Sequence, residues 1–232
     1  MSLFMTMNVT CPHCDETTTM EAVGSLNADR RADLRQQVLD GTFQQIACPK
    51  CQEIFRLAPE FSYLHVGKNQ WIAAMPSTSM VDFREEESEA SHSFSVAYGA
   101  EAPAASQLVG DSLKPRITFG WPALREKIFL ADMDLEDDIV EIAKMELLRR
   151  LPQAPLNTEI ELRLVGVDDA LLTFLWINMN TEQVIEEIQV ARSIYDQIAA
   201  DPTPWVDLQK ALNAGLFLDM KRLFMGTEEE AA

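Results

Sequence analysis

The sequence lacks most of the features from which an enzymatic function is usually inferred. Cysteine occurs only four times and histidine only three times in 232 residues. No phosphate-binding glycine loop, nucleophile elbow or HExxH motif is present. The three histidines, His13, His65 and His92, are not spaced as a ligand set. These absences disfavour an enzymatic function. An enzyme with a pocket in the C-terminal part is kept as the alternative.

Long apolar runs and basic residues are also missing. No apolar run approaches the roughly 18 residues of a membrane-spanning helix, so we expect a soluble protein without a membrane partner. The chain has 19 Lys and Arg against 37 Asp and Glu, a formal net charge of −18. Because nucleic-acid binding depends on basic residues that neutralise phosphates, this balance disfavours nucleic acid as a partner. Weak binding is kept as an alternative for the basic residues near the cysteines, which are Arg30, Arg31, Arg35, Lys50 and Arg56.

The four cysteines form two matched motifs, Cys11-Pro12-His13-Cys14 and Cys48-Pro49-Lys50-Cys51. A C-x-x-C step lets two sulfur atoms of one tight turn reach the same ion, and the proline stiffens that turn. Zinc binds four thiolates tetrahedrally, and a set of four protein ligands leaves no open coordination position. The pattern therefore predicts one structural zinc ion held by Cys11, Cys14, Cys48 and Cys51.

The main alternative for these motifs is dithiol redox chemistry. A Cys-Pro-His-Cys motif also resembles the active dithiol of thioredoxin-like oxidants. Such a site needs a helix directly after the motif, whereas residues 15–19 indicate a turn and a strand. Structural disulfides are disfavoured because we expect no signal peptide and a cytoplasmic location.

The residues between and after the two motifs carry a family resemblance. The segments Ser25-Leu26-Asn27, Asp33-Leu34-Arg35, 38–43 and 48–51 resemble the CpXC family of bacterial and archaeal proteins. The likeness covers residues 8–75 well and continues more weakly through 124–128 and 135–141. It implies a zinc ribbon in which a strand, a short helix and another strand separate the two motifs.

The sequence departs from that resemblance at two kinds of position. Asp15 and Gln52 follow the second and fourth cysteines, where such turns often have glycine to reach a positive φ. A residue with a side chain there is strained by on the order of 1 kcal/mol. The tyrosine–histidine–aspartate stretch of the family is only partly kept, as 63–66, so no role is assigned to His65.

The remaining signals divide the chain into three parts. Residues 1–75 are predicted to form the ribbon domain, with a helix closed by Gly41 and capped by Asn27 or Asp29. Residues 76–115, which contain an acidic and serine-rich run, are predicted to be a flexible segment. Residues 116–232 are predicted to form a C-terminal α+β domain.

Periodicity and turn residues predict the elements of this C-terminal part. We expect a helix over 123–131, a second helix capped by Asp134, and a hairpin of 160–164 with 172–176. Apolar residues at helical spacing predict a further helix over 184–198, which is a candidate dimer face. Five acidic residues lie at the start of the second helix: Asp132, Asp134, Glu136, Asp137 and Asp138. Helix capping explains them, and a divalent-metal site is the alternative.

Taken together, the sequence predicts an α+β protein with an N-terminal zinc ribbon that contains an inserted helix. The predicted function is a non-catalytic interaction or scaffold module with a protein partner or self-association. The alternatives are an enzyme with a C-terminal pocket, a dithiol redox protein and a weak nucleic-acid binder.

Overall fold

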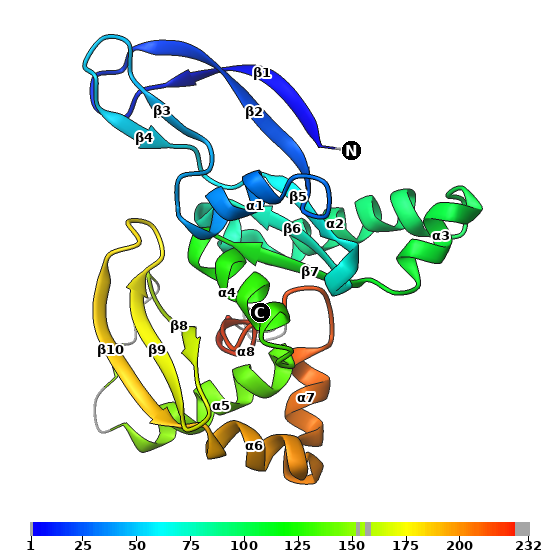
Figure 1. The fold of residues 1–232 in the computed structure, drawn as a ribbon. Helices are drawn as coiled ribbons and strands as arrows, with labels where there is room; N and C mark the ends of the chain where they lie inside the picture. Colours follow the sequence, from blue (N-terminus) through cyan, green and yellow to red (C-terminus); the bar gives the residue numbers. More distant parts are fainter. Residues whose placement is uncertain (1, 152–153, 156–158, 226–232) are drawn as a thin grey trace, which may run out of the picture. The chain divides into compact units, whose positions relative to one another are not determined.

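The computed structural model describes residues 2–151, 154–155 and 159–225 (Figure 1). The chain is a mixed α+β protein in which N-terminal strands and a cysteine cluster are followed by helices and a β-hairpin. It forms two compact units, Met1–Met80 with Ser93–Trp121 and Val81–His92 with Pro122–Ala232. The division between the units passes within helix α2 (Phe83–Tyr98).

The first unit is built on a five-stranded sheet with the order β1-β2-β5-β6-β7. The β1–β2 and β5–β6 pairs are antiparallel, whereas β2–β5 and β6–β7 are parallel. The strands are β1 (Leu3–Thr10), β2 (Thr17–Asn27), β5 (Phe61–His65), β6 (Gln70–Met75) and β7 (Lys114–Phe119). Strand β7 crosses the division that the sequence predicts, because its first two residues fall in the predicted flexible segment and residues 116–119 in the predicted C-terminal domain, yet the strand pairs with β6.

A helix and a second small sheet lie between β2 and β5 in the chain. These elements are α1 (Ala32–Leu39), β3 (Gln45–Ala47) and β4 (Ile54–Arg56). Helix α1 buries Leu34 and Val38 and is followed by Gly41 at φ 73°, as the sequence predicts. Its N-cap is Arg31 and not Asn27 or Asp29. The Asn27 side chain instead accepts a hydrogen bond from the Arg30 N–H in the preceding turn.

Two helices occupy the segment that the sequence predicts to be flexible, namely α2 and α3 (Ala104–Gly110). Phe83 and Ala90 of α2 are buried, and the Phe94 ring lies 5.2 Å from that of Trp71. The acidic residues that suggested a mobile loop lie in and near the first turn of α2, where negative charge favours a helix. Short 3₁₀ helices precede this region, η1 (Val66–Lys68) and η2 (Ser77–Asp82).

The second unit combines helices with the three-stranded antiparallel sheet β10-β9-β8. The strands are β8 (Ile160–Val167), β9 (Leu171–Asn178) and β10 (Val184–Ala191). The helices are α4 (Trp121–Asp132), α5 (Asp137–Arg150), α6 (Ser193–Ala200), η3 (Thr203–Trp205), α7 (Val206–Leu212) and α8 (Lys221–Phe224). Leu162, Phe174 and Trp176 belong to its main apolar core. The helix predicted over 123–131 and the hairpin of β8 with β9 are confirmed.

The helix predicted over 184–198 is wrong. Residues 184–191 form strand β10, and only residues 193–200 are helical. Asn178, at the end of β9, accepts hydrogen bonds from the N–H groups of Asn180 and Thr181 and so closes a hairpin turn. Asn and Thr residues favour turns and helix caps for the same reason, because their side chains bond nearby backbone groups. In the sequence, Asn180 and Thr181 can therefore be mistaken for the cap of a helix.

Two further observations concern the helices. Helix α5 begins at Asp137 with Glu136 at its N-cap, so Asp134, which has φ 52°, does not cap it. Among the helices in the described residues, none is both long and apolar enough to cross a membrane.

Candidate metal centre

The four cysteines lie in two turns with the same hydrogen-bond pattern. Cys11 and Cys14 lie in the turn between β1 and β2, and Cys48 and Cys51 lie in the turn between β3 and β4. In each turn the carbonyl of the first cysteine accepts the N–H of the residue four positions later, at 3.0 Å in both cases. The N–H of each first cysteine is bonded to the carbonyl five positions later, at 2.8 and 2.9 Å. The matched motifs in the sequence therefore fold into matched turns.

The structure brings all four sulfur atoms together. The Sγ atoms of Cys11 and Cys51 are 3.7 Å apart, and those of Cys14 and Cys48 are 3.6 Å apart. All four sulfur atoms lie within 4.8 Å of one another, so this group could hold a metal ion. Within residues 2–151, 154–155 and 159–225, no other three or more His, Cys, Asp or Glu side chains converge in this way. The acidic cluster at 132–138 is therefore not gathered into a metal site.

Both turns contain the backbone strain that the sequence predicts. Asp15 has φ 58° and Gln52 has φ 66°, each in the left-handed region. The N–H groups of these residues make the hydrogen bonds that close the two turns. The left-handed conformation is thus part of the geometry that directs the cysteines toward one point.

Apolar and charged neighbours fix the two turns against each other. Cys11 and Cys48 are buried together with Val9 and Phe55, and Met20 packs against this small core. The Lys50 ammonium lies 3.2 Å from the Glu16 carboxylate and so joins the two turns at the surface. His13 is exposed.

The crowding of the four sulfur atoms separates their pKa values. The backbone N–H groups of Cys51 and Lys50 lower the pKa of Cys48 to about 6, although burial opposes this. The N–H of Glu53 lowers the pKa of Cys51, but burial and the three neighbouring thiols outweigh it and raise that pKa to about 12. A divalent cation that binds all four sulfur atoms therefore displaces protons as it binds.

Two of the basic residues near the cysteines, Arg31 and Arg56, have local partners in the first unit. Arg31 forms an ion pair with Asp33 at 2.6 Å. The Arg56 guanidinium lies 4.6 Å from the ring centre of Trp121 and donates a hydrogen bond to the carbonyl of Gly41. These contacts engage two of the five charges on which the nucleic-acid alternative depends.

A cluster of buried charged side chains in the second unit is not evident from the sequence. The buried charge network consists of Glu126 on α4, Glu141 and Lys144 on α5, Glu161 and Arg163 on β8, and Asp219 before α8. No member is more than 5% exposed. Glu161 and Arg163 alternate with Leu162 and Leu164 in the strand, a pattern that predicts a solvent-facing side. Only the packing of helices against this side shows that both faces of β8 are buried.

Two cations link the four carboxylates of the network. Arg163 donates to Glu126 and Asp219, each at 2.8 Å, and to Glu161 at 2.6 Å. The Lys144 ammonium lies 2.8 Å from both Glu126 and Glu141. The network therefore connects α4, α5, β8 and the segment before α8.

Burial opposes ionisation of Glu126, Lys144, Arg163 and Asp219, but their oppositely charged neighbours outweigh it. The carboxylates Glu161, Asp219 and Glu126 raise the pKa of Arg163 well above its usual value. Glu141 is different, because burial raises its pKa above the ordinary range. Since the charged groups bind one another and are closed to solvent, the network supports the fold and offers no access to a substrate.

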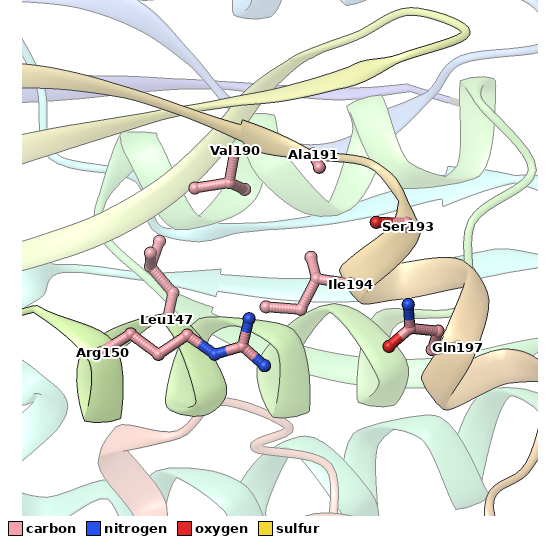
Figure 2. Close-up of a pocket in the computed structure, with 7 residues that line it drawn as sticks. All are labelled: Leu147, Arg150, Val190, Ala191, Ser193, Ile194 and Gln197. Carbon is pink, nitrogen blue, oxygen red and sulfur yellow. The ribbon is translucent and has the colours of Figure 1, made fainter.

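A cavity of about 120 Å³ lies between α5, β10 and α6 (Figure 2). Leu147, Val190 and Ile194 form its apolar part, and Arg150 and Gln197 contribute polar groups. Arg150 is the one titratable residue among those lining it, and it also lies 3.9 Å from Glu146. Small-molecule sites usually have roughly 300–1,000 Å³ and several convergent polar groups. The cavity therefore gives little support to the enzyme alternative.

Comparison with known protein families agrees with this geometry. A family model described as CpXC protein matches residues 9–144, which is more than half of the chain. The chain belongs to the CpXC family. The CpXC match includes all four cysteines and ends within α5. Neither the curated proteins nor the solved structures contain a match.

Proposed function

We propose that this CpXC protein is a zinc-stabilised, non-catalytic interaction module. In this proposal Cys11, Cys14, Cys48 and Cys51 hold one structural zinc ion, and residues 8–57 form a ribbon around it. The observation that carries the proposal is the convergence of four sulfur atoms from two matched turns, with paired distances of 3.6 and 3.7 Å.

The sulfur geometry is compatible with zinc. A tetrahedral site with Zn–S bonds near 2.3 Å places its ligands about 3.8 Å apart. The paired sulfur atoms are already close to this separation, so zinc can bind with little rearrangement of the turns. Four thiolates also complete the tetrahedral shell, which supports a structural role over a catalytic one.

The position of the cysteines weighs against dithiol redox catalysis. Each motif lies in a turn between two strands, and neither is followed by a helix whose dipole would stabilise a reactive thiolate. The reduced thiols that zinc needs persist in a reducing compartment, which supports a cytoplasmic location. With a net charge of −18, a protein partner or a second copy of the chain is favoured over nucleic acid.

Metal analysis of the full chain, purified without chelator, tests the zinc proposal. We expect one zinc per chain and four thiols that react with a chromogenic reagent only after the metal is removed. Cys14→Ser should lose stoichiometric zinc, whereas His13→Ser, in the same turn, should keep it. Zinc far below one equivalent, or a disulfide within either motif in reducing buffer, would contradict the proposal.

A further inference from the structure

Strand β1 forms an edge of the five-stranded sheet and lies next to β2 (Figure 1). In the part of the chain that the structure describes, β2 is the only strand paired with β1. Its outer side therefore presents a row of backbone N–H and C=O groups over the eight residues Leu3–Thr10. Such a row is a ready template for pairing with another strand.

Four of the eight side chains of β1 are large, apolar and exposed. Leu3 is 58% exposed, Phe4 44%, Met5 46% and Met7 38%. Met5 and Met7 lie opposite Ala22 and Met20 of β2, so one face of this two-stranded ribbon is apolar. No charged side chain occurs between Ser2 and Cys14.

Other edge strands carry the residues that normally protect an edge, and β1 does not. Strand β10 has two exposed apolar residues at its start, Val184 and Ile185, but Glu186 and Glu187 follow directly. Strand β7, the opposite edge of the first sheet, begins with Lys114 and Pro115. Charged residues and proline at edges prevent unwanted pairing. Because β1 lacks them, its edge is open to pairing with another strand.

We propose that β1 binds a second copy of the chain by antiparallel pairing with its own counterpart. A twofold axis perpendicular to the sheet, centred on Met5, places Leu3 of each copy beside Met7 of the other. Residues that pair across two strands share a face, so the apolar face of one ribbon continues into the other. Both partners use the same surface, as an isologous dimer requires.

Charge favours this strand over the rest of the surface as the place where two copies meet. Each chain carries a net charge of −18, so contact through acidic surfaces would bring like charges together. Because β1 is uncharged, two copies can pair there without directly opposed carboxylates. Repulsion between the remaining surfaces predicts that the dimer strengthens as salt rises.

This inference rests on the proposed role as an interaction module, and analytical ultracentrifugation of the metal-loaded full chain tests it. We expect a monomer–dimer equilibrium at micromolar protein that shifts toward dimer with added salt. Met5→Lys with Met7→Lys should weaken the dimer by a factor on the order of ten or more, because charge on an edge strand blocks pairing. The matched control is Val184→Lys with Ile185→Lys on β10, which should leave the dimer unchanged.

Zinc content and circular dichroism of each variant show whether it has folded. If the β1 variant fails to fold, hydrogen exchange of the unmodified chain replaces it, and β1 amides should become more protected as protein concentration rises. A chain that stays monomeric, binds only a foreign strand at β1, or dimerises equally well with both lysines in place would overturn the inference. A monomer with one zinc would refute only the dimer, whereas a β1 dimer without zinc would refute only the metal proposal.

Discussion

In the first unit, four cysteine sulfur atoms meet between the turns of the β1–β2 and β3–β4 hairpins, and most side chains of β1 and β3 are exposed. In the second unit, six buried charged groups meet between helices and a sheet that already share a large apolar core. Both clusters join segments that are distant in the chain. The thiol cluster, however, needs a cation from outside the protein, whereas the charge network contains Lys144 and Arg163 as its own cations.

This difference has a consequence for stability. The region around a thiol site reaches its full stability only when metal is bound, because the free energy of metal binding then adds to the free energy of folding. A buried ion network is complete in the folded chain, but the removal of one member leaves its partners buried without compensation. We therefore expect the cysteine region to respond to metal and the second unit to respond to single substitutions in its network.

The largest expected effect is that of Cys48→Ser. Loss of one ligand should remove metal-derived stabilisation on the order of 10 kcal/mol and loosen the cysteine region while the second unit stays folded. Limited proteolysis should then cut within residues 1–75 and leave fragments of the second unit intact. Collapse of the whole chain would show that the two units depend on one another for folding.

The next largest effect is expected for Arg163→Met in the buried charge network. This substitution leaves Glu126, Glu161 and Asp219 without their shared cation, and such losses lower the free energy of unfolding by about 3–5 kcal/mol. Arg149→Met is the matched control, because Arg149 is 61% exposed and its pair with Glu146 lies at the surface. Urea unfolding monitored by circular dichroism should separate the two variants. Equal midpoints would contradict the role given to Arg163.

Two carboxylates of the network should respond to pH with opposite sign. Burial favours the neutral form of Glu126, but Lys144 and Arg163 outweigh burial and lower the pKa of this carboxyl. Ionised Glu126 therefore stabilises the fold above the ordinary glutamate pKa near 4. This stabilisation is lost as pH falls through the lowered pKa. Burial raises the pKa of Glu141, so its contribution exists below that ordinary pKa and is lost as pH rises through the raised value.

Replacement of each glutamate by glutamine tests these opposite pH dependences of stability. At neutral pH, Glu126→Gln should lower the free energy of unfolding by about 3 kcal/mol, because Lys144 and Arg163 both lose a charged partner. Glu141→Gln should lower it by only about 1 kcal/mol, which corresponds to one hydrogen bond. Thermal unfolding across a pH series measures both variants, and a larger loss for Glu141→Gln would reverse our assignment.

The smallest effect is expected in the cysteine turns. Asp15→Gly should raise the stability of the metal-loaded first unit by up to about 1 kcal/mol, because glycine adopts φ 58° without strain. His13→Gly should lower it instead, since His13 is not in the left-handed region. Chemical unfolding of the metal-loaded chain compares the two, and a stabilising His13→Gly would refute the strain argument.

The parts of the structure that the sequence could predict are those determined by local signals. The two C-x-x-C motifs predict the convergence of Cys11, Cys14, Cys48 and Cys51, because each motif forms its own turn. Gly41 predicts the end of α1, and alternating apolar residues predict the β8–β9 hairpin.

The parts that it could not predict depend on distant partners. The residues of β10 match both helical and alternating spacing, and the pairing of β10 with β9 determines which one is used. The burial of Arg163 is not evident from the sequence, because its partners Glu126 and Asp219 lie 37 and 56 positions away in the chain. Helix α2 was missed because its apolar residues are few, although Phe83 and Ala90 are buried.

Hydrogen exchange of the unmodified chain, with and without a metal chelator, tests the central comparison most directly. Our account predicts that chelation accelerates amide exchange around the two cysteine turns, in residues 8–20 and 44–57, while α5, β8 and β9 keep their protection. Unchanged exchange around Cys11 and Cys48 after metal removal, or equal acceleration in α5 and β8, would contradict it.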